Sequence, residues 1–285
     1  MSVVNPEKKV TIPSLLSRAR KGEKLVCLTA YDAMIAKLID DAGVDMILVG
    51  DSAANVVHGH KTTLPISMDV MVAHAAAVSR GSTRALRIAD MPFLSYQPSV
   101  EVAITNAGRF LKEGFAEAVK LEGGIEIADT AKRLVELGIP VMGHIGLTPQ
   151  SIHRLGGAKV QGKQERSRQY LYESAEALES AGCFSLVLEL IESETAQEIT
   201  ARMTNLFTIG IGSGIHCDAQ VLVTNDMLGL RDPSFKPRFL REYAHLNEAI
   251  SNAVSTFTQD VRSGNYPGVS ESFNRDQAAS SESKS

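Results

Sequence analysis

The chain has 285 residues, of which 44% are hydrophobic and 22% charged, as in an ordinary globular protein. Its net charge of −4 and pI of about 6.0 argue against a nucleic-acid-binding surface. No apolar run approaches the ~20 residues that span a bilayer, and the N-terminal region lacks the apolar stretch of a signal peptide. Three widely spaced cysteines fit a reducing compartment. We therefore expect a cytoplasmic protein that binds neither nucleic acid nor membrane, with Cys27 and Cys183 as buried thiols.

A helical pattern that ends at glycine, followed by a short apolar run, recurs along the chain. Glycine just past a helix adopts the left-handed conformation at little cost, and Gly43, Gly114, Gly138 and Gly182 hold that position. The apolar runs predict eight buried strands, at residues 25–30, 46–50, 86–90, 118–122, 141–144, 186–189, 208–212 and 221–225.

Eight parallel strands with intervening helices in fewer than 300 residues predict a (βα)8 TIM barrel. A doubly wound open sheet is the alternative, and the absence of GxGxxG after the first strand weakens its nucleotide-binding form. We expect one barrel domain over residues 1–268 and a disordered tail over 269–285. Residues 148–165 predict a glycine-rich loop suited to a lid, and residues 237–262 a long helix with one apolar face.

Four acidic residues close apolar runs: Asp51, Asp90, Glu122 and Glu189. Carboxylates at the C-terminal ends of parallel strands face the end where α/β folds bind ligands. Carboxylates that converge there repel each other unless a cation or shared protons intervene. Each also has an ordinary alternative: Asp51 could cap a helix, Asp90 could shape a turn before Pro92, and Glu122 could be solvated.

The acids Asp51, Asp90 and Glu122 supply the oxygen ligands that Mg²⁺ prefers. Zinc would favour His or Cys, and His58 and His60 have no third ligand in view, so loop hydrogen bonding describes them better. The sequence therefore predicts a magnesium site.

Glu189 has aliphatic neighbours, which disfavour the charged form of a carboxyl and suit a general base. Lys120 shares a strand face with Glu122, which indicates either binding of an anionic substrate or a simple buried ion pair. His144 ends a strand and either binds substrate or satisfies a core hydrogen bond. We infer metal-assisted proton abstraction beside the carbonyl of an α-keto acid.

These residues carry a family resemblance through ordered motifs between about residue 10 and about residue 268, among them Val49-Gly50-Asp51-Ser52, His58-Gly59-His60, Ala89-Asp90-Met91-Pro92-Phe93, Lys120-Leu121-Glu122-Gly123-Gly124 and residues 143–151. In these motifs the chain resembles the ketopantoate (3-methyl-2-oxobutanoate) hydroxymethyltransferase family. The resemblance implies a barrel of the phosphoenolpyruvate/pyruvate superfamily type. It also implies hydroxymethyl transfer from 5,10-methylenetetrahydrofolate to 3-methyl-2-oxobutanoate, in pantothenate biosynthesis.

Carried over by motif, the resemblance implies Mg²⁺ on Asp51, Asp90 and Glu122, with Glu189 as the proton acceptor. The keto acid would contact Asp51, Ser52, Asp90 and Lys120, and a homo-oligomer, commonly a decamer, is expected. Lys61 departs from the acidic residue usual in the family, and residues 213–220 depart as well. Two alternatives stay open: another metal-dependent C–C lyase or mutase of the same superfamily, and a catalytically silent barrel.

Overall fold

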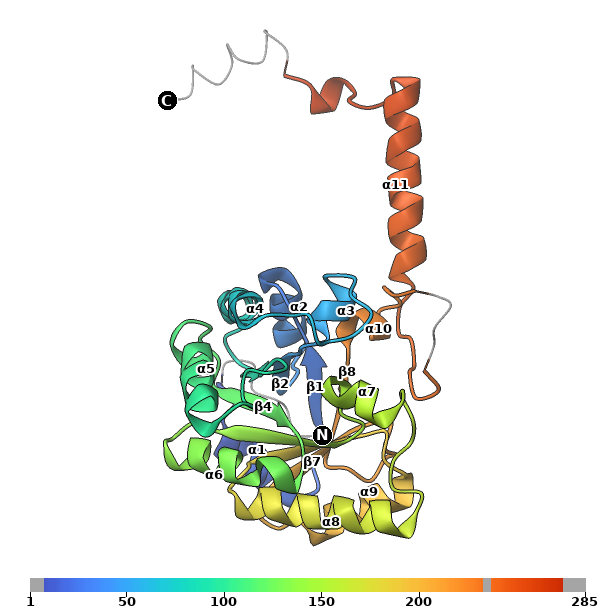
Figure 1. Ribbon diagram of the computed structural model, residues 1–285. Coiled ribbons are helices and arrows are strands. Elements are labelled where there is room, and N and C mark those ends of the chain that lie inside the picture. Colours follow the sequence, from blue (N-terminus) through green and yellow to red (C-terminus); the bar gives the residue numbers. More distant parts are fainter. Residues whose placement is uncertain (1–7, 233–236, 274–285) are drawn as a thin grey trace. The chain divides into compact units, whose positions relative to one another are not determined.

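The computed structural model describes residues 8–232 and 237–273 (Figure 1). Within them the chain forms two compact units. The first comprises residues 8–224 with 237–240, and the second residues 225–232 with 241–273. The expectation of one barrel domain over residues 1–268 stays a prediction.

The first unit contains a closed barrel in which each strand pairs in parallel with the next and β1 pairs with β8. Its strands are β1 (Leu25–Thr29), β2 (Met46–Val49), β3 (Leu86–Asp90), β4 (Ala118–Glu122), β5 (Val141–Gly146), β6 (Ser185–Glu189), β7 (Phe207–Ile211) and β8 (Ala219–Leu222). The predicted (βα)8 barrel is confirmed.

The last strand lies earlier than the sequence predicts, at Ala219–Leu222 rather than 221–225. Its register places Ala219 beside Leu25 of β1. Thr224 instead begins the short helix α10 (Thr224–Met227), and its hydroxyl donates to the Thr29 carbonyl oxygen at 2.5 Å. Pairing with β1 therefore ends the strand before residue 223.

The helices of the first unit follow the strands around the outside of the barrel (Figure 1). They are α1 (Ile12–Arg20), α2 (Ala33–Asp41), α3 (Ala53–Val56), α4 (Met68–Gly81), α5 (Val100–Lys112), α6 (Ala128–Glu136), α7 (Ile152–Leu155), α8 (Glu165–Ser180) and α9 (Ser193–Arg202). Several begin at a polar cap: the side chains of Asp32, Ser67 and Ser99 accept backbone N–H groups of the first turns of α2, α4 and α5. The predicted lid loop contains α7 and the short 3₁₀ helix η2 (Pro149–Ser151).

The barrel interior is an apolar core of alternating strand residues, among them Met46, Ile88 and Val187. Leu15 of α1 is fully buried in the same cluster as Leu25, the first residue of β1. Helix α1 therefore covers the N-terminal end of the barrel, and the C-terminal end is left for polar side chains. All three cysteines are free and buried, as predicted for Cys27 and Cys183, and burial raises the pKa of both of these thiols to about 12.

The second unit contains α11 (Leu246–Ser263), so the prediction of a helix from residue 237 is wrong about its start. The segment that leads into α11 is hydrogen-bonded to residues 227–228. The Tyr243 N–H donates to the Met227 carbonyl oxygen, and the Leu246 N–H donates to the Leu228 carbonyl oxygen. The 3₁₀ helix η3 (Val269–Glu271) follows α11, and the predicted disordered tail lies outside the described residues from residue 274 on. In the described part of the chain, every helix is too short or too polar to cross a membrane.

Candidate active site

A cavity of about 150 Å³ lies at the C-terminal ends of the barrel strands. Its lining includes every site residue that the sequence predicts: Asp51, Ser52, Asp90, Lys120, Glu122, His144 and Glu189. The barrel thus brings together side chains from β2 through β6 that are up to 138 residues apart in sequence (189 − 51).

Asp90 and Lys120 form a buried ion pair in this cavity, with side chains 2% and 4% exposed. They are register partners on β3 and β4, and Lys120 Nζ lies 2.6 Å from both carboxylate oxygens. Burial raises the pKa of Asp90 to about 7; the Lys120 ammonium opposes this shift, whereas the nearby carboxylates add to it. Burial acts against the charge of Lys120, but the surrounding carboxylates, Asp90 foremost, hold its pKa above the usual range.

Asp51 lies beside this pair, directly after β2. Its backbone N–H donates to Asp90 Oδ2 at 3.2 Å, and its Oδ2 accepts from the Gln150 amide at 3.1 Å. The N-cap of α3 is Ser52, and no side chain makes a capping hydrogen bond there. The Asp51 carboxylate therefore does not cap this helix. Ser52 Oγ in turn lies 2.8 Å from the Tyr31 hydroxyl.

Glu122 is buried, so the alternative of a solvated carboxylate is wrong. Its Oε2 accepts from the Gln150 backbone N–H at 2.9 Å. Its Oε1 has no hydrogen-bond partner among the described residues and lies 3.9 Å from Lys120 Nζ and 3.5 Å from His144 Nδ1. A buried carboxylate oxygen without a donor is unusual and costly, and it marks a place for a cation or a substrate proton.

His144 stands between two carboxylates. Its Nδ1 is 3.5 Å from Glu122 Oε1, and its Nε2 is 3.2 Å from Glu189 Oε2. Burial and the Lys120 ammonium oppose its charge, but the contacts with Glu122 and Glu189 prevail and raise the pKa of His144 to about 9. An imidazolium here therefore lies between the Glu122 and Glu189 carboxylates, although neither of its nitrogens makes a hydrogen bond to the described residues; Glu189 is 17% exposed at the cavity wall.

Asp51, Asp90 and Glu122 are the three residues that the sequence predicts to hold a metal ion. In residues 8–232 and 237–273, no group of three or more His, Cys, Asp or Glu side chains is positioned to hold a metal ion as it stands. Both oxygens of Asp90 instead accept from the Lys120 ammonium. The donor set still suits a hard cation, because it consists of buried carboxylates and one of them has an oxygen without a partner.

Sequence reasoning missed residues behind the cavity. Gln150 and Tyr96 are buried and bond both to each other and to the carboxylate-bearing segments, but neutral side chains give no charge signal. His74 of α4 was also missed: its Nε2 lies 3.0 Å from His58 Nε2, and its Nδ1 contacts the Tyr31 carbonyl oxygen at 2.7 Å. His58 is therefore engaged in the loop hydrogen bonding that the sequence favoured.

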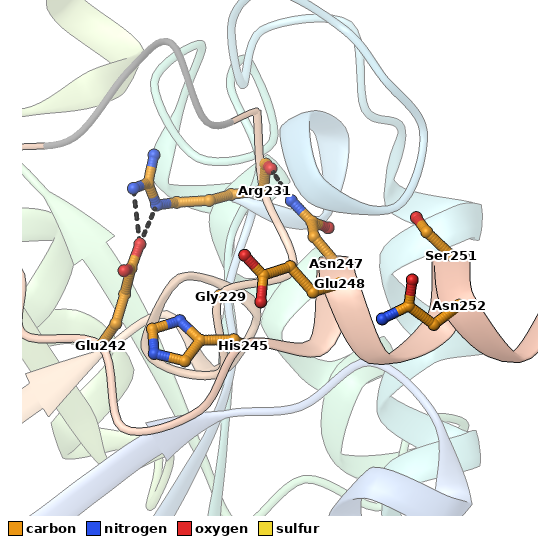
Figure 2. Close-up of a pocket in the computed structure, with 8 residues that line it drawn as sticks. All are labelled: Gly229, Arg231, Glu242, His245, Asn247, Glu248, Ser251 and Asn252. Carbon is orange, nitrogen blue, oxygen red and sulfur yellow. Dashed lines mark hydrogen bonds and ion pairs between the residues drawn. The ribbon is translucent and has the colours of Figure 1, made fainter.

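A second cavity lies in the second unit, beside the start of α11 (Figure 2). Its side chains include Arg231, which pairs with Glu242 at 2.6 Å, together with Asn247 and Glu248. Figure 2 shows the guanidinium of Arg231 directed at the Glu242 carboxylate. One Arg faces two Glu side chains here, whereas four carboxylates (Asp51, Asp90, Glu122 and Glu189) line the barrel cavity.

Comparison with known proteins identifies the family. The model of the ketopantoate hydroxymethyltransferase family matches residues 9–269. The chain belongs to this family. The 3-methyl-2-oxobutanoate hydroxymethyltransferase of Thermotoga neapolitana is 54% identical over 258 residues, which cover 90% of this chain and 94% of that protein. The enzyme of the same name from Syntrophus aciditrophicus is 50% identical over 273 residues, covering 96% and 100%.

Membership of the ketopantoate hydroxymethyltransferase family makes the chain a transferase of pantothenate biosynthesis, as the motifs predicted. Solved structures agree on the fold. Phosphonopyruvate hydrolase in complex with oxalate and Mg²⁺ matches with a TM-score of 0.58 and 13% identity, over 92% of this chain and 93% of that one. A 2,3-dimethylmalate lyase of the PEP mutase/isocitrate lyase superfamily matches with a TM-score of 0.56 and 16% identity, over 93% and 92%. Both likenesses are to the barrel fold alone; the superfamily type stays a prediction.

Proposed function

We propose that the chain transfers the one-carbon unit of 5,10-methylenetetrahydrofolate to 3-methyl-2-oxobutanoate. With one water consumed, the products are 2-dehydropantoate and tetrahydrofolate. Family membership supports the reaction. The observation that carries the site is the convergence of Asp51, Asp90, Lys120, Glu122 and Glu189 in one cavity at the C-terminal end of the barrel.

The proposed metal is Mg²⁺, held by Asp51, Asp90 and Glu122. The unpartnered Oε1 of Glu122 and the all-carboxylate donor set support this assignment. The related barrel of phosphonopyruvate hydrolase was solved with Mg²⁺ and oxalate, a small dicarboxylate. When bound, the metal would supply Lewis-acid stabilisation of the negative charge that develops on the keto oxygen.

The chain's own side chains would bind and deprotonate the keto acid. Lys120 stays cationic at neutral pH and attracts the substrate carboxylate, and Ser52 lines the same cavity. Glu189 would accept the proton from C3, so that the C–H electron pair becomes the enolate double bond. His144, 3.2 Å from Glu189 Oε2, orients that carboxylate. One water adds to the methylene carbon of the folate, both C–N bonds of that carbon break, and tetrahydrofolate leaves with its nitrogens protonated. The enolate carbon then bonds to the released one-carbon unit at the formaldehyde level, whose carbonyl oxygen takes up a proton and becomes the hydroxyl.

The assembly and location that the resemblance implies stay predictions. We propose a homo-oligomer, on the scale of a decamer, in the cytoplasm. Exposed apolar side chains on one face of α11 support a role in subunit packing: Ile250, Val254, Phe257 and Val261. Sedimentation equilibrium would measure the mass, and a monomer at micromolar concentration would contradict the proposal.

The test of the reaction is deuterium exchange at C3 of 3-methyl-2-oxobutanoate in D₂O, followed by NMR, with Mg²⁺ and without folate. We expect exchange that stops when the metal is chelated. No exchange, but cleavage of another 2-oxo acid, would favour a C–C lyase of the same superfamily. No exchange and no turnover with both substrates would leave a catalytically silent barrel.

A further inference from the structure

Gln150 is a buried amide that lies behind the cavity. It belongs to η2, is 6% exposed and does not line the cavity itself. Its Nε2 lies 2.9 Å from the Met91 carbonyl oxygen and 3.1 Å from Asp51 Oδ2. Both partners accept hydrogen bonds only, so the NH₂ end of the amide faces them and both of its protons are used.

The other end of the amide is also held. Gln150 Oε1 accepts from the Gln97 amide at 3.1 Å and lies 2.9 Å from the Tyr96 hydroxyl, whose one proton is equally close to the Glu122 carbonyl oxygen. Tyr96 is 2% exposed, and its hydroxyl also accepts the Glu122 backbone N–H at 3.1 Å. The amide therefore has one orientation, set by the two acceptors at its NH₂ end, and the groups around Oε1 hold it from the side away from Asp51.

The backbone of Gln150 makes a third contact that bears on the site. Its N–H donates to Glu122 Oε2 at 2.9 Å. One residue thus reaches the segments after β2 and β3 and the end of β4. Because Oε2 of Glu122 is engaged, Oε1 is the oxygen left without a donor among the described residues.

We infer that Gln150 is a positioning residue, whose side chain orients the Asp51 carboxylate and whose N–H orients Glu122 toward the cation. This inference rests on the proposed function for the metal itself. A hydrogen-bonded partner behind a metal ligand fixes the direction of its lone pairs, and loss of such a partner typically weakens metal binding 10- to 100-fold.

The test measures Mn²⁺ binding to the purified full chain by calorimetry and thermal unfolding of the metal-free protein. Gln150→Met keeps the length of the side chain and removes its donors and acceptor. We expect the dissociation constant for Mn²⁺ to rise about 10- to 100-fold, and C3 exchange to recover near wild-type rates at saturating metal. The matched control is Gln169→Met, at an exposed position of α8 whose amide donates to Glu173 at 2.8 Å, for which we expect a change within roughly twofold.

Tyr96→Phe is a second variant in case Gln150→Met folds poorly. It keeps the buried ring, loses the hydroxyl that holds the amide, and should weaken Mn²⁺ binding by several-fold. A lower melting temperature with an unchanged dissociation constant in both variants would make Gln150 merely structural and overturn the inference. Asp90→Ala separates the two proposals: if it binds Mn²⁺ like the wild type, or the wild type binds none, the metal proposal fails and this inference with it.

Discussion

Lys120 Nζ lies nearer to Asp90, on the neighbouring strand, than to Glu122, its neighbour on the same strand. The distances are 2.6 Å to both Asp90 oxygens and 3.9 Å to Glu122 Oε1. The ammonium therefore compensates the Asp90 carboxylate, whose pKa burial raises, and Glu122 keeps an oxygen that makes no hydrogen bond to the described residues. Such a division of charge suits a cavity that must accept both a cation and an anionic substrate.

Removal of the Lys120 charge should lower the free energy of unfolding far more than removal of a surface charge. We expect Lys120→Met to lower the free energy of unfolding by about 3–5 kcal/mol, because it leaves Asp90 buried without its ammonium. The control is Lys37→Met, whose pair with Asp41 at 2.8 Å is 62% exposed on both sides, with a much smaller expected cost. Urea unfolding measures both, and equal costs would contradict the buried pair's role.

Glu189→Gln should separate binding from proton transfer. The amide keeps the size of the carboxylate at the cavity wall but cannot accept the C3 proton. We expect keto-acid binding within a few-fold of the wild type and C3 exchange reduced about 10²- to 10⁴-fold, the usual contribution of a general base. NMR exchange and calorimetry measure the two quantities. Exchange at the wild-type rate would assign the base to another residue.

Asp90→Ala should remove metal-dependent binding of the keto acid. The substitution takes away a carboxylate of the proposed metal set and leaves the Lys120 ammonium without its partner. Calorimetry with Mg²⁺ should show no keto-acid binding that responds to chelator, whereas the wild type should lose binding when EDTA is added. Wild-type affinity in the variant would exclude Asp90 from the metal site.

Asp40, away from the cavity, makes a pH-dependent contribution to the stability of the first unit. Its buried carboxylate accepts the backbone N–H groups of Thr83, Arg84 and Ala85 at 2.7–2.9 Å. Burial acts to raise its pKa, but the hydrogen bonds from Arg84, Thr83 and Ala85 prevail and lower it from 3.8. A depressed folded-state pKa means stability that is present above pH 3.8 and lost as the pH falls through the folded value.

We therefore expect Asp40→Asn to cost about 1–3 kcal/mol at pH 7, and the difference from the wild type to shrink below about pH 4. The neighbouring Asp41→Asn, at an exposed position, should cost less than about 0.5 kcal/mol at either pH. Urea unfolding at both pH values provides the check, and a pH-independent difference would rule out linkage to this carboxyl.

Two glycines in helices should respond to alanine in opposite directions. A Cβ at Gly81, the last residue of α4, would lie 2.0 Å from the Ala33 carbonyl oxygen at the start of α2, whereas at Gly108 in α5 it would meet nothing within 4 Å. We expect Gly81→Ala to destabilise by about 1–3 kcal/mol and Gly108→Ala to stabilise by about 0.5–1 kcal/mol. Thermal unfolding measures both shifts. A stabilising Gly81→Ala would show that α2 and α4 separate freely.

The sequence by itself determined the barrel and the end of it that carries polar groups. The spacing of apolar residues and the glycines that end helices are local properties of the sequence. Apolar runs after those glycines mark strands, and acids at the ends of the runs must meet at one end of a parallel barrel. The strand at 86–90 was predicted with the bounds that β3 has, and Asp51, Asp90, Glu122 and Glu189 all line the cavity.

Only the tertiary structure decided which of these groups touch. Strand register places Lys120 opposite Asp90, and no local pattern specifies register between strands separated by a helix. The position of Gln150 depends on how η2 folds over β4, and the start of α11 depends on backbone bonds between residues 243–246 and 227–228. Neutral amides and loop contacts act through distances of about 3 Å, which become defined only once the chain has closed on itself.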